Sequence, residues 1–553
     1  MVPLASGFAQ QLNPLSSTLG STLVALIPIA LLLILLAVAR VTAWLAVIIG
    51  AVVTIIMALT IWGAPAGPTF GAWGVGAATG IWSIDWITFW GVVLYYTLVE
   101  TGAFAGFQRW LIRQATADIR VQTILLAWAM GALLEGLVGF GYPWAVIAPI
   151  LVGLGVVEID AIRVAAIANN APVSYGALGA PIIALAAVTG APLLDLSASI
   201  GRIVAVLALL PPWILILLVT GRRGLRGAWP LALVGSFGYI IGQFPTSQFL
   251  GPYLPDIIGS LVSFGALLLL LRFWRPKETL GFGGVPIEPG TTPEVVAGNP
   301  GPGTPEAAGG SGLRAAAPGL AAFGILIAIV VAATGPWSHI GDYTFIAPEV
   351  DAISSLGSHD TVAVIFKFAP AIGGTWILVS WLVVLLVLRV RGSQITSALR
   401  RSWSQMWGAL LVGPIIFGLA QVFNYAGMAS TLAYGFSRVG TWFILLAPIL
   451  GWIGVALSGS NTSTNALFGG FQYSVGSLLH MPALLLPSLN STGAEVGKPV
   501  APQTTSVGVS TSSYVRREGL VIRHNMGWTL VLLGWLILVG LLYWYVLPAG
   551  MRL

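Results

Sequence analysis

The stretch Glu135-Gly-Leu-Val-Gly-Phe-Gly-Tyr-Pro-Trp144 is glycine-rich and partly polar, and it interrupts an otherwise apolar region of the chain. A second such stretch, Ser458-Gly-Ser-Asn-Thr-Ser-Thr-Asn465, lies in the second half. Apolar arms of roughly 12–17 residues flank each stretch and are too short to span a bilayer comfortably. Broken apolar segments at matching places in two halves indicate the binding site of a secondary transporter. We therefore predict two re-entrant hairpins, near 122–155 and 441–480.

The composition is typical of a polytopic membrane protein. Of the 553 residues, 57% are hydrophobic and only 8% are charged, whereas soluble domains carry about 25% charged residues. We predict a multi-pass membrane protein, with the lipid bilayer as a partner. The net charge of +6 does not imply nucleic acid, because the basic residues lie in short loops between apolar runs. The absence of cysteine excludes disulfides and thiolate metal sites.

Hydrophobic periodicity predicts about twelve spanning helices. Two of them, 164–188 and 496–515, are rich in Pro, Gly and polar residues, so we interpret them as discontinuous helices. The predicted spans are 22–39, 41–61, 86–107, 164–188, 201–220, 229–246, 256–271, 318–334, 370–390, 404–425, 496–515 and 527–547.

The distribution of Lys and Arg predicts the orientation. It places both termini outside and every basic residue in the cytoplasm, except Arg202, Lys367, Arg438, Lys498 and Arg552. The first hairpin then enters from the cytoplasm and the second from outside. The fold class predicted is therefore an all-α membrane protein of two inverted-topology repeats, each with a re-entrant hairpin and a discontinuous helix. The repeats are 1–272 and 318–553, and a cytoplasmic Pro/Gly-rich linker, 273–317, joins them.

The hairpin tips and helix breaks supply the candidate substrate-binding residues. Helix ends present unpaired N–H groups and a partial positive charge, which suit an anion. The alternative is that these small polar residues only cap and pack the helices. The predicted substrate-binding residues are Gly139, Gly141, Asn169, Asn170, Ser174, Ser458, Ser460, Asn461, Thr462, Gln503 and Thr504.

Two acidic residues are candidates for proton coupling. Glu135 begins the first tip, and Glu100 is predicted to lie well inside the third span. Carboxylates at membrane depth are costly and are functional by default. The alternative for each is a structural hydrogen bond or an ion pair within the bundle.

These motifs resemble the L-lactate permease family. The resemblance rests on Glu135-Gly-Leu-Val-Gly-Phe-Gly-Tyr-Pro143, Ile167-Ala-Asn-Asn-Ala-Pro-Val-Ser-Tyr-Gly-Ala-Leu-Gly179, Ser458-Gly-Ser-Asn-Thr-Ser-Thr-Asn-Ala-Leu-Phe468 and the Ala501-Pro-Gln segment. It covers essentially the whole chain. It implies a proton-coupled importer of L-lactate and related small 2-hydroxy monocarboxylates, such as D-lactate and glycolate, in the plasma membrane of a prokaryote.

Other functions remain as alternatives. A sodium-coupled carboxylate symporter or a carboxylate exchanger would use the same kind of site, because hydroxyls and tip carbonyls also coordinate cations. An intramembrane enzyme is disfavoured, since the chain has no His-Glu-x-x-His and no Gly-x-Ser-x-Gly motif. No cofactor is expected beyond the proton as coupling ion, and the sequence does not determine the oligomeric state.

Overall fold

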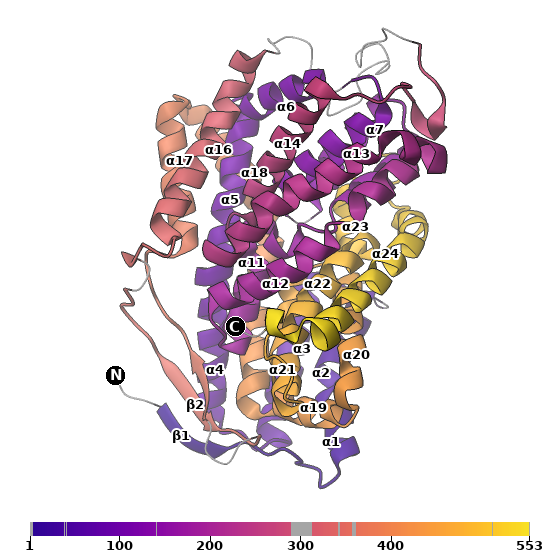
Figure 1. Cartoon of the computed structure of the whole chain (residues 1–553). Coiled ribbons are helices and arrows are strands. Elements are labelled where there is room, and N and C mark those ends of the chain that lie inside the picture. The colour runs from indigo at the N-terminus through magenta and orange to yellow at the C-terminus, as the bar shows by residue number, and fades with distance from the viewer. Residues whose placement is uncertain are drawn as a thin grey trace.

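The computed structural model describes residues 4–551, apart from 38, 40, 115, 140, 289–311, 341–342, 357–360 and 511. About half of the predicted linker, 289–311, lies outside the described residues, as do Arg40 and Arg552, whose sides of the membrane were predicted from charge. Figure 1 shows a helical molecule with a small sheet near the N-terminus. Among the described residues, ten helices are long and apolar enough to cross a membrane, or eleven if the bent pair Glu158–Ala168 and Val173–Thr189 is one span. A multi-pass α-helical membrane protein is thereby confirmed, with fewer candidate spans than the twelve predicted.

The helices follow one another with short connections, and η marks short 3₁₀ or π-helical segments. The first half contains α1 (Thr18–Ala25), α2 (Ile27–Ala37), α3 (Ala43–Thr60), α4 (Ala66–Thr79), η1 (Gly80–Asp85), α5 (Trp86–Glu100), α6 (Ala103–Gln114), α7 (Ile119–Gln122), η2 (Thr123–Met130), α8 (Gly131–Leu137), α9 (Tyr142–Gly153), α10 (Glu158–Ala168), η3 (Val173–Tyr175), α11 (Gly176–Thr189), α12 (Leu193–Leu207), α13 (Pro211–Phe249) and α14 (Pro255–Phe273). The second half contains η4 (Phe282–Gly284), α16 (Leu313–Thr334), α17 (Gly373–Val387), α18 (Gly392–Ala426), α19 (Met428–Ser437), η6 (Gly440–Trp442), α20 (Phe443–Ser458), α21 (Asn461–Leu478), α22 (Leu485–Gly497), η7 (Lys498–Val500), α23 (Pro502–Gly508), α24 (Glu518–Leu541), η8 (Leu542–Val546) and η9 (Pro548–Met551).

Several predicted boundaries are wrong. The spans predicted at 201–220 and 229–246 do not match α12, which ends at Leu207, and α13, which extends from Pro211 to Phe249. The helix predicted at 86–107 belongs to a continuous run of 35 residues, Ala66–Glu100. Its first part is built from Gly, Ala and Thr, whose hydropathy is too low to stand out. The segment predicted at 496–515 actually begins at Leu485, and α22 ends in the 3₁₀ turn Lys498–Val500. The polar residues of α22 resemble a loop in the sequence, but all of α22 is buried.

A three-stranded sheet was not predicted. β1 (Leu4–Ala9) pairs in parallel with β2 (Glu349–Ile353), and β2 pairs antiparallel with β3 (Thr361–Ile365). The sheet joins the N-terminal segment to the loop between α16 and α17. It lies apart from the helices that carry the site (Figure 1), so the expectation of an all-α fold holds only for the helical body.

Small residues bring the two 35-residue helical runs into close contact. A Cβ atom on Gly76 would lie 2.4 Å from the carbonyl oxygen of Phe417, and one on Gly80 would lie 2.8 Å from Gly413. Glycine at such crossings lets helix backbones approach closely, which favours dispersion contacts in a membrane. The contact between α4 and α18 therefore joins the two halves of the chain through backbone packing.

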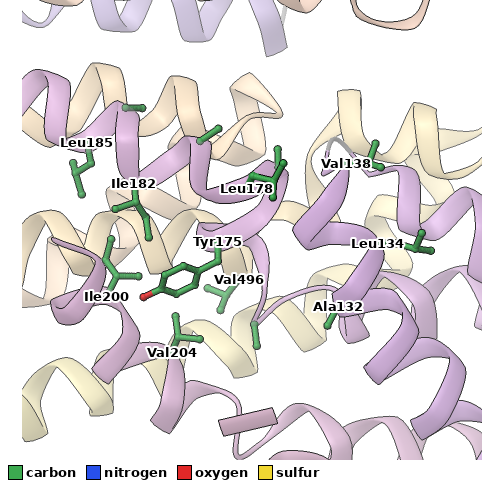
Figure 2. Packing of buried hydrophobic residues seen from close by; sticks show 14 of the residues in the cluster. Ala132, Leu134, Val138, Tyr175, Leu178, Ile182, Leu185, Ile200, Val204 and Val496 are labelled. Carbon is green, nitrogen blue, oxygen red and sulfur yellow. The ribbon is translucent and has the colours of Figure 1, made fainter. Parts of the chain in front are cut away.

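The break between α10 and α11 packs against a layer of buried apolar residues. Tyr175, in η3, lies beside Ile200 and Val204 of α12 and beside Val496 of α22 (Figure 2). Its hydroxyl donates to the carbonyl oxygen of Ser197 at 2.6 Å. A fully buried tyrosine needs such a partner for its polar end. This packing holds the break between α10 and α11 against the second half of the chain.

A buried ion pair holds the start of the first hairpin. Asp118 accepts from the guanidinium of Arg120, and both side chains are about 2–3% exposed. Arg120 also donates to the carbonyl oxygens of Gly224 and Glu278. Asp118 accepts in addition from the N–H of Leu280 at 3.1 Å. The pair thus ties α7 to α13 and to the segment that follows α14.

Candidate functional site

Two helical hairpins place their tips at the predicted residues. The first consists of α8 and α9, with Gly139 (φ 68°) and Gly141 (φ 77°) between them. The second consists of α20 and α21, with Gly459 (φ 76°) at the turn. Only glycine adopts these left-handed conformations without cost. Both tips contact α23: a Cβ on Gly141 would lie 2.6 Å from Thr504 Cγ2, and one on Gly459 would lie 2.5 Å from Gln503 Cβ.

The first broken helix carries unusual backbone geometry. Its two parts, α10 and α11, are bent by 70° relative to each other. Just after the break, Ala177 and Leu178 have positive φ angles of 47° and 58°. A non-glycine residue pays roughly 1–2 kcal/mol for this conformation, and such strain concentrates at ligand sites and switch regions.

A small cavity of about 30 Å³ lies between the two tips. Its walls include Glu135 and Gly139 from the first hairpin, and Ser460, Asn461 and Thr462 from the second. Lys498, which was not among the predicted site residues, completes the wall. Residues from both halves of the chain, far apart in sequence, therefore meet around one small cavity.

Lys498 forms a buried ion pair with Glu135. The distance from Lys498 Nζ to Glu135 Oε1 is 2.5 Å, and the two side chains are 6% and 1% exposed. The amide of Asn169 donates to the other oxygen of Glu135, Oε2, at 3.0 Å. The ion pair kept as the alternative for Glu135 is therefore present. The prediction that Lys498 lies outside is wrong: orientation arguments treat a lysine as a loop residue, and this one lies at a helix break inside the protein.

A chain of buried polar side chains connects the first helix break to the second hairpin. Ser174 Oγ is 2.9 Å from Ser491 Oγ, and the N–H of Ser174 donates to Glu495 Oε1 at 2.8 Å. Asn461 Nδ2 donates to the Ser491 carbonyl oxygen at 3.2 Å. Sequence analysis identified Ser174 and Asn461 but missed Glu495 and Ser491. The available signal was a run of polar residues, Ser488 to Glu495, before Lys498 and the Ala501-Pro-Gln motif.

Asn465 connects several members of this hydrogen-bond network, so its removal should lower the stability of the protein. Its Nδ2 donates to the Pro181 carbonyl oxygen at 2.9 Å and to Ser491 Oγ at 3.0 Å, and its Oδ1 accepts from Asn490 at 3.0 Å. Asn465→Ala leaves buried polar groups without partners, so we expect a loss of about 1–3 kcal/mol in unfolding free energy. Thermal unfolding of the purified protein measures it. Ser477→Ala, at an exposed position of the same helix, is the control, and equal melting of the two variants contradicts the assigned role.

Several buried polar atoms around the tips have no hydrogen-bond partner in the part of the chain that the structure describes. They are Asn169 Oδ1, both amide atoms of Asn170, Asn461 Oδ1 and Glu495 Oε2. Buried polar groups are nearly always paired, so each exception needs an explanation. Three of these four residues belong to the predicted substrate-binding set, and their free atoms are available to a polar ligand.

A second, larger cavity of about 350 Å³ reaches the same hairpin tip from another direction. It is lined by Ser458, Gln503 and Thr504 of the predicted set, and also by Asp85. Gly459, Ser460 and Thr462 line both cavities. The tip of the second hairpin is therefore a wall that the two cavities share.

Glu100 does not join this cluster. It is the last residue of α5, and its carboxylate lies 3.1 Å from the exposed guanidinium of Arg401. The Glu100 side chain is 18% exposed and lines neither of the two cavities. Of the two predicted coupling acids, the structure brings only Glu135 to the hairpin tips.

Comparison with known proteins assigns the family. The family model described as L-lactate permease matches residues 21–547. The chain belongs to the L-lactate permease family. It is 33% identical to the glycolate permease GlcA of Escherichia coli over 98% of both chains. It is 30% identical to the L-lactate permease of Bacillus subtilis, covering 93% of this chain and 94% of that one.

Membership of the L-lactate permease family makes this chain a transporter and not an enzyme, as the sequence predicted. It also confirms the predicted location of a multi-pass protein in a bacterial cell membrane. The solved YdaH transporter of Alcanivorax borkumensis aligns over 86% of both chains, with 14% identity and a TM-score of 0.43. That similarity is too low to assign a shared fold.

Proposed function

We propose that this member of the L-lactate permease family takes up L-lactate and related small 2-hydroxy monocarboxylates, including D-lactate and glycolate, together with a proton. Relatives named for L-lactate and for glycolate support the substrate class. The observation that carries proton coupling is the buried contact of Glu135 with Lys498 in the cavity between the hairpin tips. A carboxylate held at this depth can take up a proton and offset the charge of an anion.

The proposed site uses both hairpins and both helix breaks. Ser460, Asn461 and Thr462 at the start of α21, with the backbone near Gly139, face the substrate from the tips. Asn169, Asn170 and Ser174 face it from the first break. Gly141, Ser458, Gln503 and Thr504 form the surrounding wall toward the larger cavity. The N-terminus of α21 adds a partial positive charge suited to a carboxylate.

The proposed architecture is a pair of inverted repeats, 1–272 and 318–553, joined by the linker 273–317. Matching elements support it: a 35-residue helical run (Ala66–Glu100 and Gly392–Ala426), then a helical hairpin, then a helix break. Movement of a hairpin-bearing unit would expose the site alternately to the two sides. The tip wall shared by the two cavities is the natural place for such a gate.

Glu135 is the preferred coupling acid over Glu100. Glu135 lies at the tips and contacts Lys498, whereas Glu100 pairs with an exposed arginine at the end of α5. A role for Glu100 would therefore be peripheral, at the entry or exit of the proton.

Uptake of labelled L-lactate, D-lactate and glycolate into proteoliposomes tests the function. We expect concentrative uptake driven by an inward proton gradient in sodium-free buffer, and its collapse on adding a protonophore. Replacing choline by sodium should leave the rate unchanged. Sodium-dependent uptake would instead support the sodium-coupled alternative, and gradient-independent equilibration would support exchange. Either result overturns proton symport.

A further inference from the structure

Lys498 is a buried cation whose side chain has one charged partner. Its side chain is 6% exposed, and the Glu135 carboxylate at 2.5 Å is its only ion-pair partner among the described residues. A buried ammonium is stable only when a negative charge compensates it. Lys498 therefore requires one carboxylate at its side at all times, whichever molecule supplies it.

The position of the Glu135 carboxylate has the features of an anion site. Lys498 Nζ pairs with Glu135 Oε1, and the side-chain amide of Asn169 donates to Glu135 Oε2. The N-terminus of the 18-residue helix α21 lines the same cavity, with Ser460 as its N-cap. Asn461, 4% exposed, lines it too, and its Oδ1 has no hydrogen-bond partner among the described residues. These groups suit a ligand that has a carboxylate and a hydroxyl donor.

Glycine keeps space free around this carboxylate. A Cβ atom on Gly176 would lie 2.6 Å from Glu135 Oε1, and one on Gly139 would lie 3.6 Å from it. A side chain at Gly176 would thus collide with the anion position itself. The cavity of about 30 Å³ that remains is too small for a lactate ion while Glu135 occupies that position.

We propose that Lys498 is the residue that binds the substrate's carboxylate, and that Glu135 and the substrate compete for it. This rests on the proposed function and explains its coupling. A proton forms an O–H bond on Glu135, the neutral acid leaves Lys498, and the substrate's carboxylate takes its place. The charge of the pair stays at zero before and after. Without the proton, two carboxylates would share one ammonium in a low-dielectric site, which is strongly unfavourable.

Two other buried acids, Glu495 and Asp256, interact electrostatically with both Lys498 and Glu135, but each is held by a hydrogen bond of its own. Glu495 accepts from the Ser174 N–H, and Asp256 accepts from the Tyr239 hydroxyl at 2.7 Å. The hydroxyl of Tyr175 donates to Ser197. Among the described residues, none of these groups pairs with Lys498. In the proposed exchange, the Lys498 ammonium is shared by two carboxylates in turn, that of Glu135 and that of the substrate, so we expect one proton per monocarboxylate.

Equilibrium binding of labelled L-lactate to the purified protein across pH tests the proposal. In the wild type, the dissociation constant should rise about tenfold per pH unit where Glu135 is deprotonated, because one proton must bind with each substrate. Glu135→Gln should bind at all pH values with a constant dissociation constant. The variant Glu135→Gln/Lys498→Met, which carries neither charge and so avoids an unpaired buried ion, should bind roughly 30-fold or more weakly. Lys367→Met removes an exposed lysine and is the matched control.

The outcomes separate this proposal from the proposed function. If the double variant binds as tightly as Glu135→Gln, Lys498 is not the anchor. If folded Glu135→Gln binds at no pH, Glu135 does not merely compete with the substrate. Both results overturn the exchange while leaving proton-coupled uptake by the wild type intact. Wild-type binding that is absent or independent of pH would instead contradict the proposed function itself.

Discussion

Replacing Glu135 by glutamine is expected to abolish proton-driven accumulation of L-lactate and to spare exchange. Glutamine has nearly the same shape as glutamate but takes up no proton, so the substrate's carboxylate can pair with Lys498 without one. Steady-state accumulation under an inward proton gradient should fall at least about tenfold, since the site no longer distinguishes protonated from deprotonated states. Exchange of labelled for unlabelled L-lactate across preloaded proteoliposomes should continue.

Measuring accumulation and exchange together distinguishes a loss of coupling from a loss of folding, because exchange requires a folded protein with an intact site. Glu349→Gln, at an exposed position at the start of strand β2, makes the same chemical change away from the hairpin tips and should behave like the wild type. If Glu135→Gln accumulates L-lactate to wild-type levels in response to a proton gradient, then Glu135 is not the coupling acid.

Arg120→Met is expected to be the most destabilising single change in the first half of the chain. It leaves Asp118 buried without its cation, and removing one partner of a buried pair costs about 3–5 kcal/mol. The carbonyl oxygens of Gly224 and Glu278 lose a donor as well. Thermal unfolding followed by the fluorescence of the 22 tryptophans measures the loss.

Two further variants test whether the loss of stability comes from the buried ion pair. Arg223→Met removes an exposed arginine that lies 3.9 Å from Glu278, and exposed pairs contribute at most about 1 kcal/mol. The double variant Asp118→Asn/Arg120→Met removes the unpaired charge and should recover part of the stability. If Arg120→Met unfolds at the temperature of Arg223→Met, the ion pair does not hold α7 in place.

The hairpins could be predicted because their signals are local. Apolar arms, a glycine-rich tip and a polar cap are adjacent in sequence, and α20, Gly459 and α21 lie where the Ser458–Asn465 stretch indicated. The first broken helix was equally accessible, since Pro172 and the residues around it interrupt an apolar run. The long run Ala66–Glu100 was missed because its glycines are selected for helix contact and lower its hydropathy.

The local pattern around Lys498 and Glu495 indicates a polar segment but does not show that these two side chains are buried at the site. Both lie in a segment whose polar residues resemble a loop, and their burial depends on Ser174 and Glu135, more than 300 positions away. The three-stranded sheet was inaccessible for the same reason, because β1 pairs with a strand from the other half of the chain. Pairing between distant segments leaves no periodic signal in either segment.

The most direct test of the central claim, one proton carried with each monocarboxylate, is proton influx driven by L-lactate alone. Proteoliposomes with a trapped pH indicator, in sodium-free buffer without an imposed gradient, would receive L-lactate outside while labelled uptake is measured in parallel. We predict internal acidification equal to one proton per L-lactate taken up. L-lactate entry without acidification, once non-ionic diffusion is subtracted with protein-free vesicles, would contradict the account.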